Sequence, residues 1–441
     1  MIRTIVVFAI AVAAPIAHAG QATCSNPGLP LGTRASRDLL PGRLTLNLTN
    51  NLLPISEEEV LQEGLGQVRY NTDLVLFESR LAAEYVLTPY LAIGAAFPYR
   101  AVDVGVEQRD AATGMPIANP STIHERTERL TGVGDPTLAL HFAREVGAYS
   151  VHVRAGTSIP LGSTVEDPHA LGAIGQEHQH VQFGSGTFIP SVAVEVHRTF
   201  GPVTTLAFAL AHLSLYENGH GFKAGHRLSG GIAGSTSFGL RAWTFGLGFE
   251  AHGETAERWH GEIPIDEGNE GRVDFLLGPN AAYRFTSDFA VFADVKLPIY
   301  SHVVGNQLDY GPVVGLGVVA SFDLGSRPSW RGLDHEAVDP ATPSLAPVAG
   351  RVTVFDLWAD WCAPCRELDQ RLVELARKHP QLAVRKLEVG DSDSAAWQRY
   401  LAPGSFDLPH IKLYDANGAL VFERTAPPAE LVRAVEAYLQ R

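Results

Sequence analysis

The chain has 441 residues and a formal net charge of −14 at pH 7. This length exceeds what one ordinary hydrophobic core supports, so at least two domains are expected. The negative charge argues against nucleic acid as a partner, because a phosphate backbone is bound by Lys and Arg. The three cysteines exclude a disulfide-stapled scaffold. The 43 glycines and the low 19% of charged residues favour a long β protein.

The first residues have the pattern of a secretory signal peptide. Arg3 supplies the positive charge, an apolar stretch over 5–16 follows, and Ala17-His18-Ala19 matches an A-x-A cleavage site. We therefore predict a signal peptide over 1–19, followed by an N-terminal segment over 20–40. The apolar stretch is too short to serve as a helical membrane anchor.

Residues 41–325 show a repeated alternation of apolar and polar side chains. Successive side chains of a strand point to opposite faces, so each alternating segment predicts an amphipathic strand. We count about twelve such segments, near 43–50, 73–87, 91–104, 134–145, 149–160, 186–200, 203–216, 226–237, 240–252, 272–286, 288–302 and 312–324.

The connections between these strands alternate between tight turns and long loops. The tight turns fall at 88–90, 146–148, 201–202, 238–239 and 287–288, and the long loops near 51–72, 105–133, 161–185, 217–225, 253–271 and 303–311. An outer-membrane barrel has an even strand number, short periplasmic turns and long outer loops. The pattern therefore predicts an antiparallel transmembrane β-barrel of about 12 strands over 41–325, embedded in outer membrane lipid.

A soluble β-sandwich or barrel would show the same alternation. However, ionisable residues recur on the polar face of most segments, as Glu84, Arg154 and Glu250 illustrate. They are too many for a dry core and suit a wet lumen. Aromatic residues such as Tyr85 and Phe142 fall near strand ends, where an interfacial girdle would lie. We therefore favour the membrane barrel.

The segment over 326–349 contains four prolines and no apolar periodicity. Pro-rich segments are extended and semi-rigid, so this one is expected to act as a linker. An even number of strands leaves both ends of a barrel on the periplasmic side. The linker and the C-terminal domain over 350–441 are therefore expected in the periplasm.

The C-terminal domain is predicted to have mixed α/β structure in the order βαβαββα, and Cys362-Ala363-Pro364-Cys365 stands at the start of its first helix. A helix N-terminus lowers the pKa of the first thiol, which favours the nucleophilic thiolate. Its attack on a disulfide gives a mixed disulfide that the second thiol can resolve. A zinc site would need about four ligands, and a structural disulfide closing so small a loop would add little stability. We therefore favour redox chemistry without a cofactor.

The segment Trp358-Ala359-Asp360-Trp361-Cys362-Ala363-Pro364-Cys365 resembles the signature of the thioredoxin family. Together with Leu408-Pro409 and Asp415-Ala416-Asn417-Gly418, it is also similar to the C-terminal domain of the periplasmic membrane disulfide reductase that passes electrons across the inner membrane. The resemblance implies a thioredoxin-like fold, here without its first strand and helix. It also implies thiol–disulfide oxidoreductase activity on periplasmic or outer-membrane protein disulfides, with an inner-membrane electron donor.

The resemblance assigns roles to individual residues. It implies a redox disulfide in which Cys362 is the nucleophile and Cys365 the resolving thiol. Asp356 matches the buried acid that moves protons at the dithiol, Lys386 matches the lysine near that acid, and Pro409 matches the cis-proline that faces the cysteines. Trp361 belongs to the signature and is counted with the catalytic residues.

Two residues depart from the family pattern. His410 follows the predicted cis-proline, where Thr is common, and this change could alter substrate choice or redox poise. Gln370 replaces a proline that kinks the helix, which is expected only to straighten it.

The barrel segment offers weaker signals. Residues 131–136 and 181–186 resemble segments of channel-like outer-membrane proteins of the meta-pathway phenol-degradation type. Histidines in the predicted outer loops, above all His178 and His180, are candidate ligands for a transition metal, but solvated polar loops are the favoured interpretation. Cys24 has no local partner and is either free or exchanges with the dithiol.

These observations predict a thiol–disulfide oxidoreductase that a barrel anchors in the Gram-negative outer membrane, with its C-terminal domain in the periplasm. Two alternatives stay open. The barrel could carry a small solute or metal under redox regulation by the dithiol, or it could only localise the domain. The CAPC sequence is close to the reducing CGPC type, but it does not fix the direction of electron flow.

Overall fold

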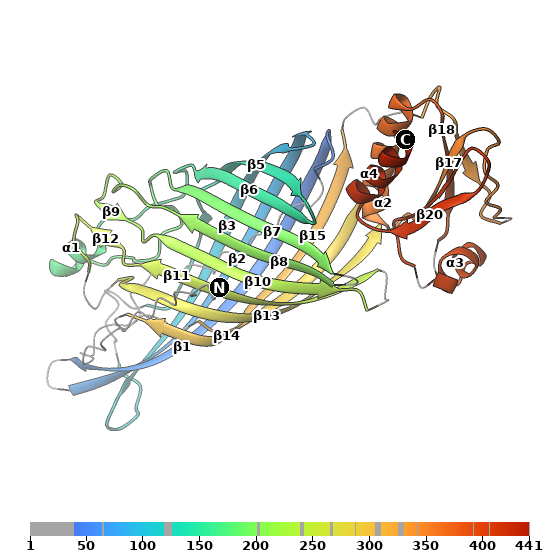
Figure 1. Cartoon of the computed structure of the whole chain (residues 1–441). Coiled ribbons are helices and arrows are strands. Elements are labelled where there is room, and N and C mark those ends of the chain that lie inside the picture. Colours follow the sequence, from blue (N-terminus) through green and yellow to red (C-terminus); the bar gives the residue numbers. More distant parts are fainter. Residues whose placement is uncertain are drawn as a thin grey trace, which may run out of the picture.

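The computed structural model describes residues 39–440, with gaps at 64–65, 119–125, 201–202, 239–241, 265–267, 287, 305–309, 325–329, 342, 391 and 405. The predicted signal peptide and Cys24 lie outside the described residues. An N-terminal β-barrel is followed by a smaller α/β domain, which lies at one end of the barrel (Figure 1).

The barrel is one antiparallel sheet that closes on itself. Its strands are β1 (Arg43–Glu63), β2 (Gly66–Thr88), β3 (Leu91–Asp110), β4 (Glu128–Val133), β5 (Thr137–Val146), β6 (Tyr149–Ser158), β7 (Pro190–Phe200), β8 (Val203–His212), β10 (Arg227–Thr236), β11 (Trp243–Thr255), β13 (Gly271–Thr286), β14 (Phe289–Val303) and β15 (Val313–Asp323). Closure occurs where β1 pairs with both β2 and β15.

Strands β4 and β5 form one interrupted strand of the barrel. Both pair with β3, β4 along Tyr99–Val104 and β5 along Leu91–Ala96. Between them stands Asp135, whose carboxylate accepts hydrogen bonds from the backbone N–H groups of Gly162 (2.9 Å) and Ser185 (2.7 Å). Counting β4 and β5 together gives twelve strands, so the predicted 12-stranded antiparallel barrel is confirmed.

The prediction of a long loop over 51–72 is wrong. Residues 51–72 continue the β1–β2 hairpin, which stays paired as far as Glu63 opposite Gly66. The end of β3 pairs with β2 along this extension, and Figure 1 shows the three strands extending past the other strands of the barrel. Leu53, Ile55, Val68 and Tyr70 on one face of this extension are buried and alternate with more exposed residues. Pro54 and the acidic run over 57–59 interrupt the alternation in the sequence, which favoured a loop. The remaining long loops contain α1 (Pro168–Ala173) and a two-stranded sheet of β9 (Phe222–Lys223) and β12 (Arg258–Trp259).

The outer face of the barrel is apolar, and its inner face carries charged residues beside a buried apolar cluster that includes Leu76. Ile232 on the outer face is 63% exposed, whereas the inward-facing Glu78 is 2% exposed. Glu78 forms ion pairs with Arg80 (3.0 Å) and Arg100 (2.8 Å), so the buried carboxylate is neutralised in place. This polarity is the reverse of a water-soluble barrel and is typical of one surrounded by lipid.

The C-terminal domain is a five-stranded sheet with helices on both faces. Its elements are β16 (His335–Val338), β17 (Val352–Trp358), α2 (Ala363–Lys378), β18 (Leu382–Glu388), α3 (Ala395–Tyr400), a 3₁₀ turn (Ala402–Gly404), β19 (His410–Tyr414), β20 (Leu420–Thr425) and α4 (Pro428–Leu439). The strand order is β16-β18-β17-β19-β20. Helices α2 and α4 pack on the face that contains Val354, and α3 packs on the opposite face, which contains Phe355.

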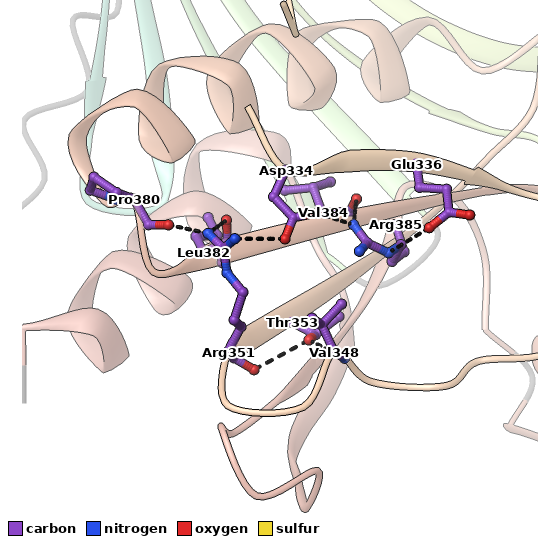
Figure 2. Close-up of polar contacts among 9 residues, drawn as sticks. All are labelled: Asp334, Glu336, Val348, Arg351, Thr353, Pro380, Leu382, Val384 and Arg385. Carbon is purple, nitrogen blue, oxygen red and sulfur yellow. Dashed lines mark hydrogen bonds and ion pairs between the residues drawn. The ribbon is translucent and has the colours of Figure 1, made fainter. Parts of the chain in front are cut away.

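The segment predicted as a linker contains the first strand of this domain. Strand β16 pairs in parallel with β18, so the domain does not lack a first strand as the sequence comparison implied. Figure 2 shows Asp334 between Arg351 and Arg385, with both carboxylate–guanidinium distances at 2.8 Å. A four-residue strand beside several prolines is too short to leave a periodic signal, which explains why the sequence did not reveal it.

Candidate redox site

The cysteine pair lies at the N-terminus of α2. Cys362 is the N-cap residue, and its Sγ accepts a hydrogen bond from the backbone N–H of Cys365 at 3.2 Å. The two residues are joined by a disulfide, with their Cα atoms 5.3 Å apart, and both are buried. Pro364 occupies the first helical turn, where its missing N–H leaves no bond unmade. The unpaired N–H groups of this turn can stabilise the thiolate that reduction would create.

Apolar side chains pack against the pair, and one of them precedes a cis-proline. Trp361 and Leu408 pack against the two cysteines, and the Trp361 ring lies 6.4 Å from that of Trp397 on α3. The Leu408-Pro409 peptide bond is cis, as the resemblance implied. It directly precedes β19, which pairs with the β17 strand that leads to Cys362. The fold thus brings the predicted Cys362, Cys365, Trp361 and Pro409 into one region.

Asp356 is fully buried on the central strand β17. Alternation along the strand places it on the same face as Val354, beneath α2. Burial raises the pKa of its carboxyl from 3.8 to about 7, against the opposing effect of Lys386. Neither carboxylate oxygen has a hydrogen-bond partner among the described residues. A carboxyl in this state can accept or release a proton near neutral pH.

Lys386 lies opposite Asp356 in the β17–β18 register, but its ion pair is with another acid. Its Nζ is 2.7 Å from Oδ1 of Asp369 on α2 and stands 4.8 Å from the centroid of the Trp358 ring. Asp369 was missed in the sequence. Its position four residues after Cys365 places both on one face of α2, a signal that could have revealed it.

His410 is buried directly after the cis-proline. Its Nδ1 and the Thr425 hydroxyl are 2.9 Å apart, and its ring packs on Phe406 at 4.5 Å between centroids. Burial, with a smaller contribution from Lys412, lowers the pKa of His410 to about 4, so the imidazole is neutral at neutral pH. Gln370 is the other residue that departs from the family pattern, and helix α2 continues through it without interruption.

The loop histidines differ from expectation because they are not solvated. His178 and His180 are buried, and their ring centroids are 5.0 Å apart. His169 lies 5.4 Å from His180 in the same cluster, which long-range packing of the loops brings together. Within the described ranges, no group of three or more His, Cys, Asp or Glu residues is placed to hold a metal ion. No described helix is both long enough and apolar enough to cross a membrane.

Fold and site together define a two-domain protein in which a closed β-barrel carries a thioredoxin domain with a CAPC dithiol. The chain belongs to the family described as "Putative MetA-pathway of phenol degradation", whose model matches residues 61–301. The thioredoxin family model matches residues 346–435.

Three curated relatives, all named thioredoxins, match part of the chain. A thioredoxin of Geodia cydonium is 27% identical over 77 residues, which are 18% of this chain and 69% of that protein. An H-type thioredoxin of Fagopyrum esculentum is 40% identical over 48 residues, 11% of this chain and 41% of that protein. An H-type thioredoxin of Picea mariana is 31% identical over 70 residues, 16% of this chain and 49% of that protein. The chain thus spans less than two thirds of both H-type thioredoxins.

Two solved structures are similar to the two parts of the chain. An outer membrane channel from Pseudomonas putida F1 has 12% sequence identity and a TM-score of 0.46, with coverage of 66% of this chain and 100% of that one. Thioredoxin f2 of Chlamydomonas reinhardtii has 21% identity and a TM-score of 0.20, with coverage of 23% of this chain and 94% of that one.

Proposed function

We propose that this chain is an outer-membrane-anchored, periplasmic thiol–disulfide oxidoreductase that reduces or exchanges disulfides of envelope proteins. One arrangement carries the proposal: the Cys362–Cys365 disulfide caps α2, cis-Pro409 lies beside it, and the buried Asp356 lies beneath the same helix. A dithiol at a helix N-terminus supplies the nucleophile for disulfide exchange, and a proton-accepting carboxyl nearby can assist it.

The proposed reaction begins with the reduced dithiol. The Cys362 thiolate attacks a substrate disulfide, forms a mixed disulfide and releases one substrate thiolate. The Cys365 thiol then passes its proton to Asp356 and attacks the Cys362 sulfur, which releases the second substrate thiolate. The substrate gains two electrons and the domain is left with its disulfide. A dithiol donor protein must return those two electrons, and we expect it to draw on the inner membrane.

The proposed location is supported by the polarity of the barrel and by its topology. Twelve strands bring both ends of the barrel to the same rim, where the Leu324 N–H donates to the Gly42 carbonyl at 2.8 Å. This is the rim of the short turns, because Asp288, in the turn between β13 and β14, contacts both Arg43 (3.2 Å) and Arg366 of α2. Short turns face the periplasm in outer-membrane barrels, and the predicted signal peptide fits export.

The test uses the full chain, folded in detergent or lipid and reduced beforehand. Wild type should reduce insulin with dithiothreitol as the electron source, and Cys362→Ser should lower turnover to the uncatalysed rate. Cys365→Ser should accumulate a mixed disulfide with insulin, because the resolving thiol is absent. Equal turnover by wild type and Cys362→Ser would refute the proposal. Electrophoresis of unheated and boiled samples serves as the folding control, because a folded barrel is expected to migrate differently from the unfolded chain.

A second function is favoured by the charged inner wall of the barrel, where residues such as Glu250 and Lys296 form an ion pair at 2.7 Å. Such a wall suits the passage of a polar solute or metal ion, with the dithiol in a regulatory role. Liposome swelling separates the two functions. Solute uptake that depends on the redox state of Cys362 and Cys365 would favour regulated transport, and uptake unaffected by Cys362→Ser would make the two activities independent.

A further inference from the structure

The segment that joins the barrel to the redox domain contacts the polar side chains under the dithiol. Trp330 is the first described residue after the gap at 325–329. Its indole N–H donates to Oδ1 of Asp369 at 3.0 Å, and its ring stacks on His335 with centroids 4.4 Å apart. Because His335 begins β16, which pairs with β18, the whole segment Trp330–Val338 is fixed to the domain.

Asp369 in turn holds the lysine that would otherwise neutralise the buried acid. Its Oδ1 accepts from both Trp330 and the Lys386 ammonium, the latter at 2.7 Å. Lys386 stands opposite Asp356 in the strand register, yet neither oxygen of Asp356 has a partner among the described residues. The Lys386 ammonium therefore pairs with Asp369 and not with the buried carboxylate of Asp356.

We propose that the segment Trp330–Val338 is a positioning element of the redox centre. Trp330 orients Asp369 toward Lys386 and so withholds the ammonium from Asp356. The catalytic consequence rests on the proposed function, because it assumes that Asp356 takes a proton from Cys365. The arrangement links the chain connection to the barrel with the protonation state of the acid under the dithiol.

The charged groups around Asp356 define the direction in which its pKa is expected to change. Lys386 of β18 favours the ionised form, while Asp369 of α2 and the burial itself oppose it. On its other side Asp356 pairs with the apolar Ile411 of β19. Burial lowers the pKa of His335, so the neutral ring adds no charge near neutral pH. Without the indole N–H, the Asp369 side chain, which is 30% exposed, can turn to solvent and release Lys386.

The test is a double-mutant cycle on the reduced full chain. The rate of Cys362 alkylation by iodoacetamide is measured from pH 5 to pH 9 in wild type, Trp330→Phe and Asp369→Asn, each also combined with Asp356→Asn. Trp330→Phe keeps the aromatic ring but removes the donor. We expect it to move the Asp356-dependent inflection down by about one pH unit, and Asp369→Asn to move it further because it also removes a like charge.

Two controls make the result decisive. His335→Phe preserves the stacking and donates nothing to Asp369, so it should leave the inflection unchanged. In the Asp356→Asn background, Trp330→Phe should have no effect, because the route runs through Asp356. An unchanged inflection in both Trp330→Phe and Asp369→Asn, or equal shifts with and without Asp356, would overturn the proposal.

The cycle also separates this proposal from the proposed function. Insulin turnover is measured on the same samples. A shifted inflection without insulin reduction by wild type would refute the oxidoreductase function and leave the positioning role intact. Insulin reduction by wild type, together with an unshifted inflection in Trp330→Phe and Asp369→Asn, would support the oxidoreductase function and refute the positioning role.

Discussion

The two domains follow opposite rules of polarity within one chain. In the barrel, apolar side chains such as Ile232 face outward and carboxylates such as Glu78 face inward. In the thioredoxin domain, apolar residues such as Leu372 form the interior and most charges lie outside. Side chains alternate between the two faces of both sheets. Helices cover both faces of the redox-domain sheet, so its central strand β17 is buried on both sides, whereas the outer face of the barrel sheet is exposed and apolar, as expected for contact with lipid.

Buried carboxylates sharpen the contrast. Glu78 in the barrel has two arginine partners, whereas Asp356 in the redox domain has no hydrogen-bond partner among the described residues. A paired charge supports the fold, while an unpaired one costs stability and persists where a proton must move. The same substitution of carboxylate by amide should therefore have opposite effects in the two domains.

The largest effect is expected for Asp356→Asn. The pKa of Asp356 is raised from 3.8 to about 7 in the folded state, so the folded domain binds more protons than the unfolded chain between these values. Stability therefore falls as pH rises through this window, and the full penalty is present above about pH 7. The amide should stabilise the domain by roughly 4 kcal/mol at pH 8, and by less than half of that at pH 5. Guanidinium unfolding followed by tryptophan fluorescence measures both values, and an equal gain at the two pH values would contradict the assignment.

An arginine placed on each exposed apolar surface tests the medium directly. Ile232 of the barrel is 63% exposed and Leu420 of the redox domain is 49% exposed. Ile232→Arg should cost about 2–4 kcal/mol if the side chain faces the lipid core, whereas Leu420→Arg should change stability by less than about 0.5 kcal/mol. Urea titration of the barrel in lipid vesicles, beside guanidinium unfolding of the domain, gives the comparison. A negligible cost at Ile232 would argue that the barrel faces water.

Glu78→Gln is the counterpart of Asp356→Asn in the barrel. The amide would leave Arg80 and Arg100 without their counter-charge on the inner wall. The expected cost is roughly 2 kcal/mol, below that of a fully buried pair because both arginines keep some exposure. Barrel unfolding in urea measures it, and Glu177→Gln at an exposed position of an outer loop is the matched control for loss of a carboxylate. If Glu78→Gln stabilised the barrel, the change from carboxylate to amide would act in the same direction in both domains, and the contrast with Asp356 would be refuted.

The smallest effect is expected at the contact between the domains. Asp288 of the barrel and Arg366 of α2 form a partly exposed ion pair. Such pairs contribute about 0–1 kcal/mol, so Asp288→Asn should leave the unfolding midpoint of each domain nearly unchanged. Loosening of the domain on the rim should instead appear as faster proteolysis near the connection. A large loss of barrel stability would mean that Asp288 acts chiefly through Arg43, its other partner at 3.2 Å.

Features that repeat along the chain were predictable from the sequence, and features that depend on distant neighbours were not. Twelve strands could be counted because a sheet with one apolar face imposes a period of two. The redox site could be located because Cys362, Cys365 and Pro409 match a family signature. The pairing of Lys386 with Asp369, however, depends on how α2 sits on the sheet, and the burial of His178 depends on loops that meet only in the folded chain. Strand β16 is too short to show any period.

The incorporation of β16 and Trp330 into the redox domain shortens the connection to the barrel. The barrel is described as far as Leu324, so six peptide steps separate it from Trp330. At about 3.3–3.6 Å per residue, they span at most roughly 20 Å. Under the proposed function, a disulfide held at the rim of the same barrel would meet the dithiol at an effective concentration on the order of millimolar, while one held beyond that radius would be out of reach of this copy. The short connection would then make distance from the rim a criterion of selection, in addition to the chemistry of the substrate.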